Sequence, residues 1–223
     1  MTILGGGNLM RTPIFVKVER FNLESKAKEI EAIRNCFDRY LDSYPVKSAR
    51  SKTSLMGPVG KVLQGARSGK WDVESLTGYA LNIHLANPKA KGYISQEARE
   101  ALREGIDRLL TLLRTIPVTA QEKVLDRIDY GLYFARRAKG LEWLENIRQD
   151  FVEFLRGKYG TPENLAQAWS GKPQDYGVDF AKVRYPSKAM FAEATGQKKT
   201  DIGEFAQQAE LKGYELVEEE EEI

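Results

Sequence analysis

The sequence predicts a mainly α fold: an antiparallel helical bundle with a short N-terminal extended or strand segment and a small helical C-terminal extension. Apolar residues recur at helical spacing over most of the 223 residues, and proline and glycine separate the periodic segments. One short stretch, residues 13–19, carries the β-branched and aromatic residues typical of a strand. That strand pairs with a late segment of the chain or with another subunit, or it does not form.

This pattern divides the chain into four parts. They are an N-terminal extended segment (1–22), a helical bundle domain (23–170), a short-helix extension (171–214) and an acidic tail (215–223). The helical domain contains a basic, glycine-rich loop over residues 43–71.

The first predicted helix spans residues 25–42, because Ile30, Ile33, Phe37 and their neighbours form one apolar stripe. Pro45 stops it. In the basic loop that follows, the density of glycine leaves room for a short helix over 59–66.

A helix over 73–86 comes next, with Asp72 as its N-cap. Ser95 caps a strong helix that runs to about residue 116. Thr119 and Glu122 form a capping box that opens a further helix, which runs to Ala135.

Gly140 interrupts or bends the chain, and a last long helix covers residues 141–158. Three consecutive amphipathic helices with short breaks predict an antiparallel bundle over 95–158, with the helix at 25–42 packed on it. After Gly160 and the Thr161 cap come short helices, the last over 201–211 with Asp201 in a capping pair.

The segment from Phe154 to Trp169, FLRGKYGTPENLAQAW, resembles a helix-turn-helix element of the family 42 β-galactosidases, of the form WLRxKYGTxExLNxAWG. The resemblance covers 16 of the 223 residues. That family acts through a much larger (β/α)₈ barrel with two catalytic glutamates, and this chain has no alternating βα pattern. The resemblance therefore implies a structural element, in which Leu165 and Trp169 fold back on the preceding helix, and no activity.

Composition excludes several classes of chemistry. Cys36 and His84 are the only residues of their types, so an internal disulfide is impossible and a zinc site lacks its usual ligands. No apolar run is long enough to span a membrane, and residues 1–11 have no secretory h-region. We therefore expect a cytoplasmic protein with no membrane partner and no cofactor.

Charge is sorted along the chain. Residues 43–71 carry no acid, and the chain ends on five consecutive glutamates, Glu218 to Glu222. Residues 1–200 have a balance of +10 and residues 201–223 a balance of −8. Such asymmetry indicates a polyanionic partner. The glutamate run is a solubilising tail or an autoinhibitory mimic of nucleic acid that screens the basic segment.

Basic side chains on a glycine-rich loop can follow a phosphate backbone, and a flanking aromatic can stack on an unpaired base. The candidate nucleic-acid-binding residues are Lys47, Arg50, Lys52, Lys61, Arg67, Lys70, Trp71, Arg136 and Arg137. Arg136 and Arg137 are also expected near a helix C-terminus, where the helix dipole alone accounts for them.

Enzymatic alternatives have less support. The stretch from Gly65 to Lys70 lacks the spacing and the hydroxyl of a nucleotide-binding P-loop. The pairs Asp126 with Asp129 and Glu142 with Glu145 leave Mg²⁺-dependent chemistry open, although nearby arginines favour salt-bridged helix faces.

Two functions follow from the sequence. The first is a non-enzymatic, helical nucleic-acid-binding protein or nucleoprotein-complex subunit that contacts an RNA or DNA backbone through the basic loop. The second is a protein–protein interaction or assembly subunit of a larger complex, with no direct nucleic-acid contact. Both imply protein partners, and neither assigns a catalytic residue or a metal.

Overall fold

The computed structural model describes residues 21–43, 49, 52–86, 94–211 and 216. This part of the chain is mainly helical and contains no strand, which confirms the mainly α class. The strand predicted over residues 13–19 and the Glu218–Glu222 run lie outside the described residues.

The helices follow one another along the chain with short connections. In order they are α1 (Ala27–Leu41), α2 (Lys52–Arg67), α3 (Val73–Ala86), α4 (Gln96–Thr115), α5 (Val118–Tyr159), α6 (Pro162–Trp169), α7 (Pro173–Tyr176), α8 (Lys188–Glu193) and α9 (Gly196–Leu211). Two 3₁₀ turns, η1 (Leu23–Lys26) and η2 (Val178–Phe180), precede α1 and α8.

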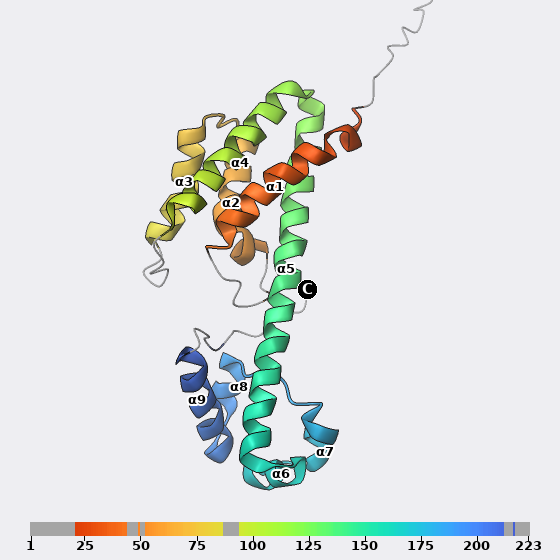
Figure 1. Ribbon diagram of the computed structural model, residues 1–223, viewed down its shortest axis with the longest axis vertical. Helices are drawn as coiled ribbons and strands as arrows, with labels where there is room; N and C mark the ends of the chain where they lie inside the picture. Colours follow the sequence, from red (N-terminus) through yellow and green to blue (C-terminus); the bar gives the residue numbers. More distant parts are fainter. Residues whose placement is uncertain (1–20, 44–48, 50–51, 87–93, 212–215, 217–223) are drawn as a thin grey trace, which may run out of the picture.

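Two lobes lie along α5 (Figure 1). In the N-terminal lobe, α1 to α4 pack with the first half of α5 around one apolar cluster, which ends at Tyr133. In the C-terminal lobe, α6 to α9 gather at the other end of α5 around a second cluster, whose first buried residue is Ile147. We call residues 134–142, between the clusters, the waist of α5. The core thus divides within α5, whereas the sequence-based division falls between residues 170 and 171.

The capped, strongly amphipathic helices form where the sequence predicts them. The Ser95 side chain accepts a hydrogen bond from the backbone N–H of Ala98 at 3.1 Å. Asp72 Oδ1 accepts one from the backbone N–H of Ser75 at 2.7 Å. Each cap satisfies an N–H that the first helical turn leaves without a partner. The predicted apolar stripe of α1, including Cys36, is buried.

The predicted basic loop is wrong over most of its described length, because α2 spans Lys52–Arg67 and contains Pro58. At position 65 the glycine serves helix packing rather than chain flexibility. A Cβ on Gly65 would overlap Leu76 of α3, so this position requires glycine for the close approach of the two helices. Gly69 has a φ of +77° just after the helix and ends it in the left-handed region.

The break predicted within residues 118–159 is also wrong, because α5 is one helix of 42 residues. Its N-cap is Pro117, with no side-chain cap, so the capping box of Thr119 and Glu122 does not form. Gly140 is buried inside the continuous helix. Glycine lowers helix stability by only about 1 kcal/mol relative to alanine, which surrounding contacts can offset. Residues 95–158 therefore form two helices instead of three.

The turn after α5 has the predicted form. Gly160 has a φ of +75°, and the Thr161 side chain caps α6 by accepting from the backbone N–H of Asn164. Leu165 is fully buried in the C-terminal cluster, and Trp169 packs against that cluster. The predicted cap at Asp201 is wrong, since α9 begins at Gly196 and Asp201 is a buried interior residue.

The contact between α1 and α4 gives a test of this packing. A Cβ on Gly105 of α4 would lie 2.8 Å from the ring of Phe37 and 3.0 Å from Cys36 Cβ. We expect Gly105→Ala to lower the free energy of unfolding by about 1–3 kcal/mol, because both neighbours are buried and must move. Urea unfolding measures the change.

Gly157→Ala in α5 is the matched control, since nothing lies within 4 Å of its Cβ position. It should leave stability unchanged or raise it by up to about 1 kcal/mol. Equal effects of the two substitutions would contradict the close packing of α1 on α4.

Candidate interaction surface

Two cations of the acid-free stretch lie against carboxylates of α5. Lys52 Nζ is 2.6 Å from the Asp129 carboxylate. Arg67 donates from Nε to Glu122 at 2.7 Å and from Nη2 to Asp126 at 2.8 Å. These ion pairs join α2 to α5. Lys52 and Arg67, both candidate nucleic-acid contacts, are thus already engaged within the chain.

The pairing neutralises much of the basic character of α2. Burial alone would lower the pKa of Arg67, but its hydrogen bonds and the charges of Glu122 and Asp129 outweigh this and raise it. Arg67 therefore stays charged as a partner of α5. The described residues contain no group of three or more His, Cys, Asp or Glu side chains that could hold a metal ion. The Asp126 and Asp129 pair thus has a structural use as the partner of α2.

Arg136 has a structural position. Its side chain is buried, and Nη1 lies 3.3 Å from Asp38 Oδ1 and 2.9 Å from Asp42 Oδ1. Nη2 donates to the carbonyl of Leu41 at 3.0 Å. The predicted dipole partner was the C-terminus of its own helix, but α5 continues past it. Arg136 instead meets the C-terminus of α1, where carbonyls lack helical partners and favour a cation.

Two further cations of α5 strengthen this contact. Lys139 Nζ lies 3.0 Å from Asp38 and 3.4 Å from Asp42. Burial would lower the pKa of Lys139, but these two carboxylates raise it above its ordinary value. Arg137 Nη1 donates to the carbonyl of Ala49 at 3.4 Å. The basic residues of the waist thus fasten α5 to the N-terminal lobe.

Trp71 is not presented for stacking. It is half-buried against the N-terminal cluster, and its Nε1 donates to the carbonyl of Ala66 at 3.2 Å. Arg114 donates to the carbonyl of Trp71 at 2.8 Å. The residue closes the α2–α3 connection onto the core.

Lys61 and Lys70 differ from the other described candidates, since neither pairs with a carboxylate of the described residues. Lys70 Nζ lies 3.7 Å from the ring centroid of Tyr79 and also contacts its hydroxyl. The hydrogen bond and the charge of Lys70, with a smaller effect of Lys61, lower the pKa of Tyr79. Lys61 of α2, the half-buried Lys70 of the α2–α3 connection and Tyr79 of α3 form a small basic patch. Lys47 and Arg50 lie outside the described residues.

A different surface was missed by the sequence analysis. Tyr130, Phe134 and Leu141 of α5 are 51%, 62% and 46% exposed, and we call them the waist face. Tyr130 has the ammonium of Lys52 4.4 Å from its ring centroid. The three residues are spaced four and seven apart, so they share one side of a helix. This spacing is visible in the sequence, but the break predicted at Gly140 assigns Leu141 to a different helix from the other two.

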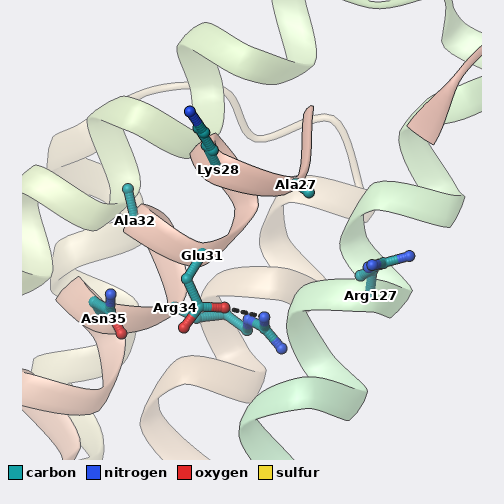
Figure 2. A pocket seen from close by; sticks show the side chains of 7 residues that line it. All are labelled: Ala27, Lys28, Glu31, Ala32, Arg34, Asn35 and Arg127. Atoms are coloured by element: carbon teal, nitrogen blue, oxygen red, sulfur yellow. Dashed lines mark hydrogen bonds and ion pairs between the residues drawn. The ribbon is translucent and has the colours of Figure 1, made fainter. Parts of the chain in front are cut away.

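A shallow hollow of about 480 Å³ opens between the start of α1 and α5 (Figure 2). Its lining consists of Ala27, Lys28, Glu31, Ala32, Arg34, Asn35 and Arg127. The Arg34 side chain pairs with Glu31 and occupies the space over Gly131. The hollow is open to solvent and lacks the enclosed shape typical of a small-molecule site.

A buried polar cluster organises the C-terminal lobe around Asp201. Its carboxylate accepts hydrogen bonds from Tyr159 Oη at 2.6 Å, from Trp169 Nε1 at 2.6 Å and from Gln197 Nε2 at 2.9 Å. Lys158 Nζ lies 2.8 Å away. The resemblance segment thus closes on α9 through side chains of its KYG and AW positions. We assign this cluster to stability, since its donors and acceptors satisfy one another.

The cluster shifts two pKa values. Burial would raise the pKa of Asp201, but the hydrogen bonds from Lys158, Tyr159 and Trp169 outweigh it, so the pKa is held below its usual value. Burial and the Asp201 charge together raise the pKa of Tyr159 to about 12. Asp201 is therefore ionised and Tyr159 neutral at neutral pH.

Comparison of the chain with models of protein families, with curated proteins and with solved structures finds no match. None of the helices in the described part of the chain is both long and apolar enough to cross a membrane.

The Asp201 cluster predicts a pH-dependent loss of stability. Asp201→Asn should lower the free energy of unfolding at neutral pH by about 2–4 kcal/mol, because Lys158 loses its buried partner. The folded-state pKa of Asp201 lies below its unfolded value, so its contribution is present above about pH 4 and is lost as the pH falls through the folded pKa. The difference between wild type and variant should therefore shrink between about pH 7 and pH 3 in urea unfolding. A difference that stays constant would contradict the assignment.

Proposed function

We propose that the chain is a non-enzymatic assembly subunit that binds a protein partner through the waist face of α5. The supporting observation is that three exposed apolar residues, Tyr130, Phe134 and Leu141, lie along one side of α5, from the end of the N-terminal cluster into the waist. Single exposed apolar residues are ordinary, but an aligned set that includes two aromatics is typical of a protein interface.

The position of the waist face adds to this argument. The opposite side of α5 packs against the N-terminal lobe through Ile128 and Leu132, both buried. Farther along α5, Leu144 is buried against Ala49, and Tyr185 packs on this contact together with the neighbouring Trp143. The waist face is the side of α5 that these contacts leave exposed. It lies on a rigid helix, so little conformational entropy is lost on binding.

A cytoplasmic location belongs to this proposal. Cys36 is a free, buried thiol. A free thiol suits the reducing cytoplasm, where the sequence analysis expects the protein.

A second candidate function, nucleic-acid binding, is supported by the basic patch of Lys61, Lys70 and Tyr79. Two lysines without a carboxylate partner in the described residues beside an exposed aromatic suit a phosphate and an unpaired base. The patch is smaller than the predicted set, because Lys52, Arg67 and Arg136 are paired internally. It supports weak contact with a backbone and no sequence readout.

The proposed docking function predicts the effect of one charge on the waist face. Phe134→Glu should reduce recovery of bound protein at least about tenfold when the tagged chain is purified from its host, because a desolvated carboxylate in an apolar contact costs several kcal/mol. Quantitative mass spectrometry of the bound fraction, with nuclease present, measures the change.

Val178→Glu is the matched control, since Val178 is 89% exposed in the C-terminal lobe away from the waist. It should leave the bound set unchanged. Both variants should have the thermal stability of wild type, because both side chains are exposed. Equal recovery with Phe134→Glu and wild type would contradict docking through this face.

The second function has its own test. Lys61→Glu combined with Lys70→Glu should weaken binding to a single-stranded oligonucleotide by at least about tenfold and reduce the slope of log K against log salt by about 1–2. Lys172→Glu with Lys199→Glu, the same charge change in the C-terminal lobe, should have a smaller effect. Fluorescence anisotropy at several salt concentrations distinguishes the two pairs. If the two double variants bind the oligonucleotide equally well, the basic patch is not the binding site.

A further inference from the structure

Acidic residues are scarce around α2 and α3. Residues 43–96 carry eight lysines and arginines and only two acids, Asp72 and Glu74. Both acids have a use within the fold, since Asp72 caps the first turn of α3 and Glu74 pairs with Arg103 of α4 at 2.6 Å. The two lysines of the basic patch have no carboxylate partner in the described part of the chain. The patch thus keeps its positive charge, which suits an anionic ligand.

The side of α3 that carries Tyr79 is small and polar apart from its one ring. Ser75 lies four residues before Tyr79 and Asn82 three residues after it, so the three side chains share one side of the helix. All three are exposed. A hydroxyl and an amide beside an aromatic ring offer little apolar area to a protein partner, whereas both are ordinary donors to phosphate and sugar oxygens.

Gly78 leaves the surface next to Tyr79 open. Nothing in the described part of the chain lies within 4 Å of the position that a Cβ would take there, so no internal contact requires glycine. Glycine destabilises the interior of a helix relative to alanine. The missing side chain does allow the backbone of a ligand to approach α3 closely. The glycine therefore supports a ligand that runs across this helix.

We propose that the ligand of the basic patch is single-stranded nucleic acid, with phosphates held by Lys61 and Lys70, a base stacked on Tyr79 and the strand passing over Gly78. This inference rests on the second candidate function, because it names the ligand of the same patch. The Lys70 ammonium lies 3.7 Å from the centroid of the Tyr79 ring, so a phosphate bound by that lysine is held beside the ring. Tyr79 is 42% exposed, which leaves ring surface for a base.

The ring decides between a single strand and a duplex. A base inside a duplex is covered on both faces by its neighbours, so it cannot stack on a side chain unless it leaves the helix. The two lysines contact phosphates, which single strands and duplexes both present. The contribution of Tyr79 should therefore appear with a single strand and be absent with a duplex.

Replacing the ring tests the stacking. Tyr79→Ser should weaken binding to a labelled oligothymidylate at least about fivefold, the lower limit for one base stacked on an aromatic side chain. The same variant should bind the oligonucleotide annealed to its complement, and a heparin fragment that has no bases, as wild type does. Tyr79→Phe keeps the ring and should bind the single strand normally. Phe134→Ser, which removes an exposed ring of the waist face, is the matched control and should have no effect. Fluorescence anisotropy at one fixed salt concentration measures all of these affinities.

A second variant tests the path of the strand without removing a contact. Gly78→Gln should weaken binding of the single strand, because the new side chain occupies the space over α3. It should not lower the melting temperature, since the Cβ position is open and glutamine favours a helix more than glycine does. Gly157→Gln in α5 is the matched control, because its Cβ position is equally open, and it should bind as wild type does. Normal binding by Gly78→Gln would contradict a strand that passes over this residue.

The outcomes separate this inference from the second candidate function. If Lys61→Glu with Lys70→Glu weakens binding but Tyr79→Ser binds the single strand as wild type does, the patch is a phosphate site and the stacked single strand is wrong. If neither change affects binding, the second candidate function fails together with the inference. A loss in Tyr79→Ser that is confined to the single strand, with Tyr79→Phe unaffected, supports single-stranded nucleic acid as the ligand.

Discussion

The architecture depends on the continuity of α5. A helix of 42 residues extends about 63 Å, which is longer than either lobe needs for its own packing. The N-terminal cluster uses its first turns and the C-terminal cluster its last. Between the two clusters, the lobes are joined by the backbone hydrogen bonds of this one helix. The exposed waist exists because the helix does not break there.

Local contacts explain why the waist stays helical. Helices in water are marginal without tertiary contacts, and Gly140 weakens this one. Arg136 and Lys139 bind the end of α1, and Ala49 and Tyr185 pack against Leu144 of α5. The basic residues that looked like a polyanion surface thus stabilise a long helix. Their carboxylate partners lie about 95–100 residues away in the sequence, which no local charge count can reveal.

Much of the helical content was predictable, for specific reasons. Ser95, Asp72 and Gly160 carry strong local signals, because a cap or a left-handed residue depends on its immediate neighbours. Gly65 misled the prediction of α2, because its role is set by the approach of α3 and not by intrinsic helix propensity. The pairing of Arg67 with carboxylates of α5 could not be predicted, since it is a tertiary property. The spacing of the waist-face residues can be read from the sequence. Their exposure cannot, because it depends on which side of α5 the lobes cover.

Amide hydrogen exchange along α5 tests the central claim of one uninterrupted helix most directly. Slow exchange through residues 134–142, continuous with that of the turns on either side, is the predicted result, since each amide there has a partner four residues earlier. Fast exchange confined to the residues around Gly140, with protection in both lobes, would show a break at the waist and would contradict the account.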